Sequence, residues 1–119
     1  MAIRLLVLKS ADFDRTINFY RALGIPLLWE RHGNGPQHLA TQVGSTVLEF
    51  YPCHLGEART SEVQIGFDVR DLAAVTDQIR SLGLTVIREP KKSNGELTAI
   101  VVDPDGHRVT LYEPLTPLP

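Results

Sequence analysis

The stretch from Asp12 to Gly24 reads DFDRTINFYRALG, and the stretch from Asp71 to Gly83 reads DLAAVTDQIRSLG. At a constant offset of 59 residues, both begin with aspartate and share an arginine, a leucine and a final glycine. Self-similarity at a fixed spacing is typical of a repeated structural unit. The chain is therefore expected to contain two copies of one supersecondary unit.

Each of the two stretches predicts an amphipathic helix with both ends marked. Asp12 and Asp71 are good N-cap residues, because an aspartate side chain accepts hydrogen bonds from the first helical turn. Gly24 and Gly83 stand where a left-handed residue closes a helix. The apolar residues recur at steps of three and four, which predicts one buried face per helix: Phe13, Ile17, Tyr20, Leu72, Val75, Ile79 and Leu82.

Strand-like runs flank both helices. Apolar and polar residues alternate from Val63 to Val69, which predicts a half-buried strand, whereas the run from Ile3 to Lys9 is apolar almost throughout and predicts packing on both faces. Each helix is followed by three further strands. Asn-Gly pairs predict hairpins at 33–35 and 93–95, in which both turn residues have positive φ. Two further turns are expected at Val43-Gly44-Ser45 and Pro104-Asp105-Gly106.

The predicted fold is α+β, with two repeated βαβββ modules and curved mixed sheets. Module one covers about 1–53, a polar link covers 54–60, and module two covers about 61–115 of a single domain, 1–119. One helix covers only one face of a sheet, so we expect the two open faces to enclose a shared cleft.

Composition excludes several classes of protein. The chain has 119 residues, 43% of them apolar, and a net charge of −2, which argues against a general nucleic-acid binder. Apolar runs fall far short of the roughly 20 residues of a membrane helix, and no secretory signal is evident at the N-terminus. Cys53 is the single cysteine and cannot form an intrachain disulfide, so a reducing, cytoplasmic setting is expected.

Three segments give the chain a family resemblance: Ala11-Asp12…Asn18-Phe19-Tyr20…Leu23-Gly24, the closing hairpin Asp103–Arg108, and Leu111–Pro114. With the duplicated helix, they resemble the vicinal oxygen chelate superfamily, which includes glyoxalases, bleomycin-resistance proteins and extradiol dioxygenases. The resemblance covers nearly the whole chain and implies the glyoxalase/bleomycin-resistance fold. It does not by itself fix a reaction, because one fold hosts many functions.

The resemblance also implies where a metal would bind. Metal-using members place a His or Gln in the first strand and a Glu in the last strand of each module, and the matching positions here are Leu5, Glu49, Gln64 and Thr110. Leu5 has no donor atom, and a threonine hydroxyl is a poor ligand for Zn, Ni, Fe or Mn. We therefore expect no cofactor. If a divalent metal binds, Glu49 and Gln64 are the expected ligands.

Several residues carry two interpretations each. Glu49 is either a strand carboxylate at the cleft mouth or, if desolvated inside the cleft, a general base. Gln64 either bonds across a partly wet sheet or binds a ligand. Arg108 makes a surface ion pair, or it pairs with Glu49 or an anionic ligand. Leu5 and Thr110 are expected to line the cleft, and Trp29, Tyr51 and Tyr112 either stack on a planar ligand or pack in the core.

The remaining reactive side chains have structural interpretations. His107 is predicted to be a solvated turn residue, and His32 and His54 to be loop histidines. The spacing of His38, His54 and His107 gives no reason to place them on the cleft face. Cys53 is expected to be inert, since no acyl-transfer constellation surrounds it.

Small members of the resembled family form twofold dimers, so we expect a homodimer. Leu5, Glu49 and Trp29 of one chain would face Gln64, Arg108, Thr110 and Tyr112 of its mate. Three functions follow as hypotheses: a metal-free small-molecule binder of the bleomycin-resistance type, a metal-dependent glyoxalase-like lyase, isomerase or dioxygenase, and a protein whose filled cleft serves a protein contact. The first is preferred, because the pocket is short of metal donors.

Overall fold

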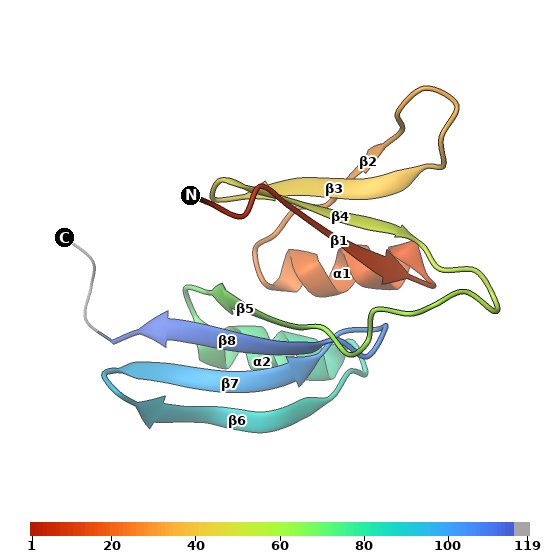
Figure 1. The fold of residues 1–119 in the computed structure, drawn as a ribbon. Coiled ribbons are helices and arrows are strands. Elements are labelled where there is room, and N and C mark those ends of the chain that lie inside the picture. Colours follow the sequence, from red (N-terminus) through yellow and green to blue (C-terminus); the bar gives the residue numbers. More distant parts are fainter. Residues whose placement is uncertain (116–119) are drawn as a thin grey trace. The chain divides into compact units, whose positions relative to one another are not determined.

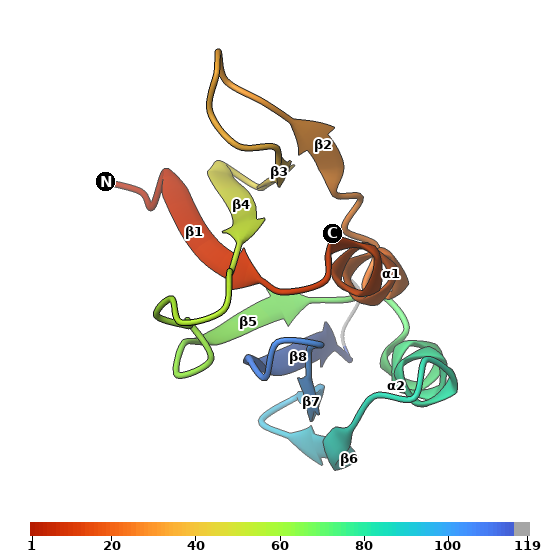
Figure 2. The same ribbon diagram turned by 90° about the vertical axis from the view of Figure 1, so that its right-hand side faces the viewer.

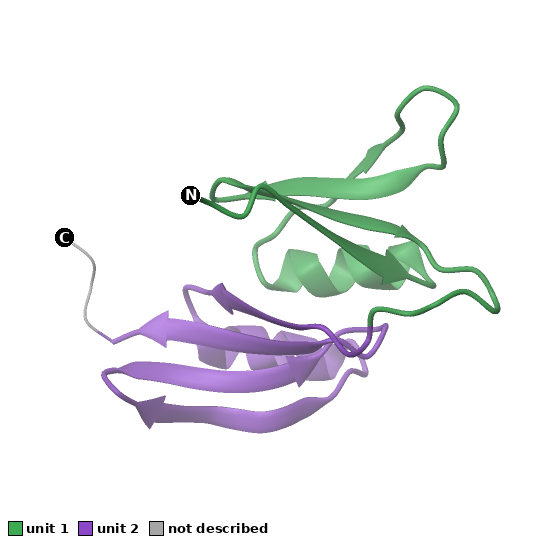
Figure 3. Ribbon diagram, viewed as in Figure 1, with its two compact units in different colours: residues 1–60 green, residues 61–119 purple. Residues whose placement is uncertain are grey.

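A computed structural model describes residues 1–115 and contains two helices and eight strands in two four-stranded sheets (Figure 1). This confirms the predicted α+β fold. The chain divides into two compact units between Thr60 and Ser61 (Figure 3). Each unit has the element order βαβββ.

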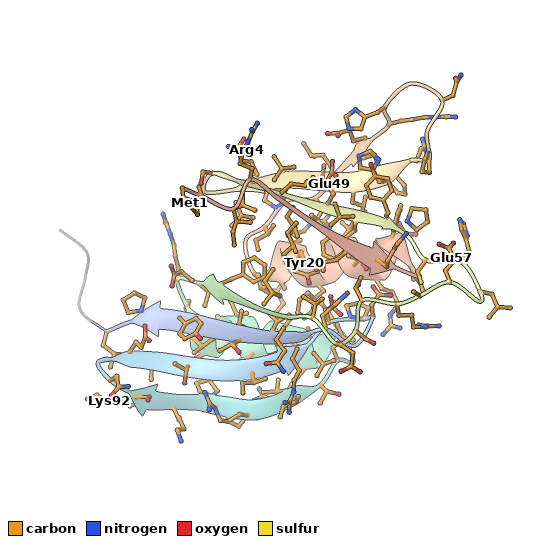
Figure 4. The ribbon with its side chains drawn as sticks, in the orientation of Figure 1. Met1, Arg4, Tyr20, Glu49, Glu57 and Lys92 are labelled. Carbon is orange, nitrogen blue, oxygen red and sulfur yellow. The ribbon has the colours of Figure 1, made fainter. Side chains whose placement is uncertain are left out.

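The first unit consists of β1 (Leu5–Ser10), α1 (Phe13–Ala22), β2 (Leu28–Glu30), β3 (His38–Val43) and β4 (Thr46–Pro52). Its strand order is β1-β4-β3-β2, with β1 parallel to β4 and the other neighbours antiparallel. Helix α1 packs on one face, where the Tyr20 ring lies 4.9 Å from the Phe50 ring. Glu49 lies on the opposite face of the same sheet (Figure 4).

The second unit repeats this plan with β5 (Gln64–Asp68), α2 (Leu72–Ser81), β6 (Val86–Ser93), β7 (Glu96–Val102) and β8 (Arg108–Pro114). Its strand order is β5-β8-β7-β6, with β5 parallel to β8. Each helix lies against one side of its own sheet (Figure 2). The fully buried side chains of this unit include Leu72, Ile79, Val101 and Leu111.

Both helices have the ends that the repeated stretch predicts. The side chain of Asp12 accepts a hydrogen bond from the Arg15 amide at 3.2 Å, and Asp71 accepts one from Ala74 at 3.1 Å. Gly24 and Gly83 follow the helices with φ of 88° and 77°. These two conformations are the left-handed ones that glycine adopts without strain.

Two local expectations were wrong. Leu5 and Val7 of β1 are 55% and 40% exposed, because α1 covers only one face of the sheet. The Asn34-Gly35 pair does not form a two-residue hairpin: β2 ends at Glu30, β3 begins at His38, and within this loop only Gly33 has a positive φ. The second pair behaves as predicted, since Asn94 and Gly95 have φ of 51° and 80° in the β6–β7 turn. Among residues 1–115, no helix is long and apolar enough to cross a membrane.

Candidate functional site

Four potential metal-ligating side chains meet on the face of the first sheet that α1 leaves open. Glu30, at the end of β2, is the register partner of His38, at the start of β3. Glu49 in β4 pairs with Ala40, two residues along β3, so its side chain is on the same face as that of His38. His32 lies two residues after the end of β2. One donor atom from each of the four residues lies within 4.8 Å of the others.

His38 is at the centre of this cluster. Its Nε2 atom lies 3.2 Å from Oε1 of Glu30 and 3.4 Å from Oε2 of Glu49. The Nε2 atom of His32 lies 2.5 Å from Oε1 of Glu30 and 4.0 Å from Oε2 of Glu49. The two carboxylates therefore share the same pair of imidazoles.

The environment of His38 fixes its ring. The side chain is 1% exposed, and Nδ1 lies 3.2 Å from the carbonyl oxygen of Pro36. A carbonyl oxygen can only accept, so Nδ1 is the donor in this hydrogen bond, while Nε2 lies 3.2 Å from Oε1 of Glu30. The Tyr51 ring stacks on the imidazole at 4.3 Å with an interplanar angle of 7°. His38 thus presents Nε2 to the two carboxylates in a single orientation.

The pKa of Tyr51 is raised in its position beside the cluster. Desolvation raises the pKa of its phenol above the ordinary value of 10.0, and the negative charges of Glu49 and Glu30 raise it further. All three side chains belong to the same face of the sheet, which explains why the two carboxylates add to the effect of desolvation on the pKa of Tyr51.

The first unit brings only some of the predicted site residues together. Leu5 and Tyr51 lie on the open face with Glu49, by register and by alternation along β4. Trp29 points to the other face: it pairs with Leu39 and makes an edge contact with Phe13 of α1 at 5.3 Å between ring centroids.

In the second unit, the predicted residues share the face that α2 leaves open. Gln64 pairs with Arg108, Gly66 with Thr110, and Asp68 with Tyr112. Tyr112 covers Gly66 closely, since a Cβ at Gly66 would be 3.0 Å from Cε2 of the ring. Gln64 and Arg108 are exposed, whereas Thr110 and Tyr112 are half-buried.

The sequence interpretation overlooked Arg88 in the second unit. Its Nη2 donates to the Thr98 hydroxyl at 2.7 Å, while its Nε is buried without a hydrogen-bond partner among residues 1–115.

The prediction that His107 is a solvated turn residue was wrong. His107 is fully buried, and its Nδ1 lies 2.6 Å from Oδ2 of Asp103. The other Asp103 oxygen accepts the amides of Asp105 and His107, at 3.0 and 2.9 Å. Asp103 thus holds both the ring and the backbone amide of His107 inside the turn before β8. His54, in contrast, is exposed in a loop near Glu57, as expected.

Glu30, His32 and His38 were not predicted to act together. Treating Asn34-Gly35 as a tight turn misplaces the β2–β3 register, and only the correct register puts Glu30 opposite His38. The alternation of His38, Ala40 and Gln42 along β3 was the signal that could have placed His38 on the open face.

Comparison with known proteins identifies the family. Residues 3–111 match the model of the Glyoxalase/Bleomycin resistance protein/Dioxygenase superfamily, and the chain belongs to this superfamily. It is 30% identical to a lactoylglutathione lyase of Haemophilus influenzae over 127 residues, which cover 95% of this chain and 93% of the relative. It is 27% identical to an uncharacterized protein of Mycolicibacterium smegmatis, over 95% of this chain and 94% of that protein.

Solved structures agree on the fold. TnmS3, an antibiotic-binding protein from Streptomyces sp. CB03234, superimposes with a TM-score of 0.72 at 20% identity, over 96% of both chains. At this level of identity the likeness concerns the fold alone.

The metal positions implied by the family do not fit a metal site in this chain. Of Leu5, Glu49, Gln64 and Thr110, only the glutamate and the glutamine are useful donors. Leu5 presents an apolar side chain on the open face, 55% exposed. The donors concentrate instead on the other side of Glu49, in β2, β3 and the loop between them.

Proposed function

We propose that this protein binds a small polar molecule on the open face of its first sheet, with Glu49 as the principal polar contact. The observation that supports this is the setting of Glu49. Its side chain is only 12% exposed, yet it stands beside the exposed apolar side chain of Val7 and close to Tyr51. An apolar surface with a few convergent polar groups is typical of a small-molecule site.

The superfamily supports the proposal but leaves the ligand open. One structural neighbour is an antibiotic-binding protein, and one sequence relative is a lactoylglutathione lyase. We therefore propose two probes, bleomycin and S-lactoylglutathione. Binding is measured by native mass spectrometry, and turnover of the thioester is followed on the same sample.

The decisive variant is Glu49→Leu, which replaces the carboxylate by an apolar side chain. Glu62→Gln is the matched control, since Glu62 is exposed and lies outside the open face of the first sheet. We expect at least one probe to bind the wild type and the control, and the affinity to fall at least tenfold in Glu49→Leu. Equal binding by Glu49→Leu would contradict the proposal.

Glyoxalase-like catalysis is the second candidate, favoured by the contact between Glu49 and His38. A carboxylate held against an imidazole can move a proton from a bound substrate. Turnover of S-lactoylglutathione that is lost in Glu49→Gln would establish it. The homodimer and the cytoplasmic location stay predictions, the latter supported by the free Cys53 thiol.

A further inference from the structure

We infer that Glu30, His32, His38 and Glu49 form a binding site for one first-row divalent metal ion, contained within the first unit. Only Glu49 is shared with the positions that the family resemblance implied. The inference does not depend on the small-molecule proposal, because it concerns the ion alone.

The spacing of the donor atoms suits such an ion. Zinc lies about 2.0–2.2 Å from nitrogen and oxygen ligands, so the donors of a tetrahedral site are separated by roughly 3.3–3.6 Å. His38 Nε2 is 3.2 and 3.4 Å from the two carboxylates, and His32 Nε2 is 4.0 Å from Glu49. The Nε2 atom of His32 lies 2.5 Å from Oε1 of Glu30, and this separation would lengthen when an ion enters. Only small side-chain movements are needed.

The ring of His38 is prepared for coordination. Its Nδ1 donates a hydrogen bond to the Pro36 carbonyl, and its Nε2 faces the carboxylates of Glu30 and Glu49. A ligating histidine in proteins typically donates its second nitrogen in this way, which fixes the tautomer and the ring orientation. Stacking on Tyr51 and nearly complete burial restrict the ring further.

The negative charges of the two carboxylates also favour the binding of a cation. With neutral imidazoles, Glu30 and Glu49 carry two negative charges close to the same nitrogen atom of His38. Among residues 1–115, no lysine or arginine lies within 4.0 Å of either carboxylate, and the nearby Arg31 side chain donates to the Gly35 carbonyl. A divalent ion would balance both carboxylates at once.

The site is accessible to ions from solvent, and its ligand types favour transition-metal ions. The side chains of His32 and Glu30 are 67% and 40% exposed, so an ion can enter from solvent and keep water among its ligands. Two imidazoles with two carboxylates suit Zn²⁺, Ni²⁺, Co²⁺ or Fe²⁺ better than Ca²⁺ or Mg²⁺, which prefer oxygen ligands alone.

The test uses the metal alone on the full chain. Protein stripped with a chelator is titrated with Zn²⁺ in competition with a chromophoric indicator, and metal content is measured after dialysis. We expect one Zn²⁺ per chain, and a loss of affinity of at least tenfold in each of the variants Glu30→Gln, His32→Gln, His38→Gln and Glu49→Gln. His54→Gln is the matched control and should bind as the wild type does, since His54 lies in an exposed loop outside the cluster.

Two further measurements distinguish loss of a metal ligand from loss of folding, and this site from the family positions. His38 is buried and its variant can misfold, whereas the side chains of His32 and Glu30 are exposed and half-buried. The folding of the Glu30 and His32 variants is checked by circular dichroism, and their zinc affinities decide the outcome. Gln64→Ala separates this site from the family positions and should leave the affinity unchanged. Substoichiometric zinc, wild-type affinity in His32→Gln or Glu30→Gln, or loss of zinc in Gln64→Ala would overturn the inference. Failure of bleomycin and S-lactoylglutathione to bind would leave it standing.

Discussion

The buried pair of Asp103 and His107 is expected to be a structural element that holds the turn before β8. The change that tests this is Asp103→Ala. It removes the acceptor of three hydrogen bonds, from the His107 ring at 2.6 Å and from the amides of Asp105 and His107 at 3.0 and 2.9 Å. It also leaves the buried His107 ring without this acceptor.

The expected effect is large. A hydrogen bond to a charged group contributes about 1.5–3 kcal/mol, and breaking a buried pair by removing one partner costs about 3–5 kcal/mol. The three bonds share one carboxylate and do not add independently, so we expect a loss of about 3–5 kcal/mol in the free energy of unfolding. That is a substantial part of the roughly 5–15 kcal/mol of a typical domain.

Urea denaturation followed by circular dichroism measures this loss, with Asp77→Ala as the control. Asp77 is exposed and pairs with Arg80 on the surface of α2 at 2.8 Å, so its removal should cost about 1 kcal/mol or less. A loss below about 1 kcal/mol in Asp103→Ala would refute the structural role. Dependence of the loss on added chelator would show instead that Asp103 and His107 hold an ion.

Three further predictions concern the open faces and the assembly. Glu49→Gln removes one of the two negative charges that raise the pKa of Tyr51, so the phenol should titrate at lower pH than in the wild type, measured by ultraviolet absorbance with Tyr51→Phe as the reference. Gly66→Ala places a Cβ 3.0 Å from the Tyr112 ring and should destabilise the fold by about 1 kcal/mol, a loss that Tyr112→Leu in the same chain should reduce. Light scattering should give twice the chain mass of 13.2 kDa if the predicted homodimer forms, and the monomer mass would contradict it.

The helices and the duplicated unit were accessible from sequence because their signals are local. Asp12 and Asp71 cap by bonding an amide three residues away, and the glycine after each helix needs only its own backbone freedom. The Asn94-Gly95 hairpin is local for the same reason. The fold follows from these signals, since a unit with one helix and four strands has few ways to bury its apolar side chains.

The candidate site was harder to predict, because it depends on strand register. A shift of one residue in the pairing of β2 with β3 turns Glu30 to the other face and dissolves the cluster. The register of β2 with β3 cannot be predicted from sequence, because the loop from Arg31 to Gln37 lacks a two-residue turn that would set it. In the sequence, nothing distinguishes His38 from a histidine that only flanks a loop. His107 was misjudged for a related reason: its partner, Asp103, lies across a turn whose interior cannot be inferred from residue types alone.

The position of β4 explains how a donor set can form beside Glu49 although Leu5 cannot bind a metal. β4 is flanked by β1 on one side and β3 on the other, so Glu49 has Val7 as one neighbour and Ala40 as the other. The neighbour of Glu49 in β1 is Val7, which has no donor atom, whereas β3 brings His38 within 3.4 Å of the Glu49 carboxylate. A donor set on the β1 side of Glu49 and a donor set on its β3 side would use the same backbone, the same open face and the same glutamate. The ligands of a metal can therefore lie on either side of this strand without any change of fold, which is why a missing donor in β1 does not argue against metal binding in this protein.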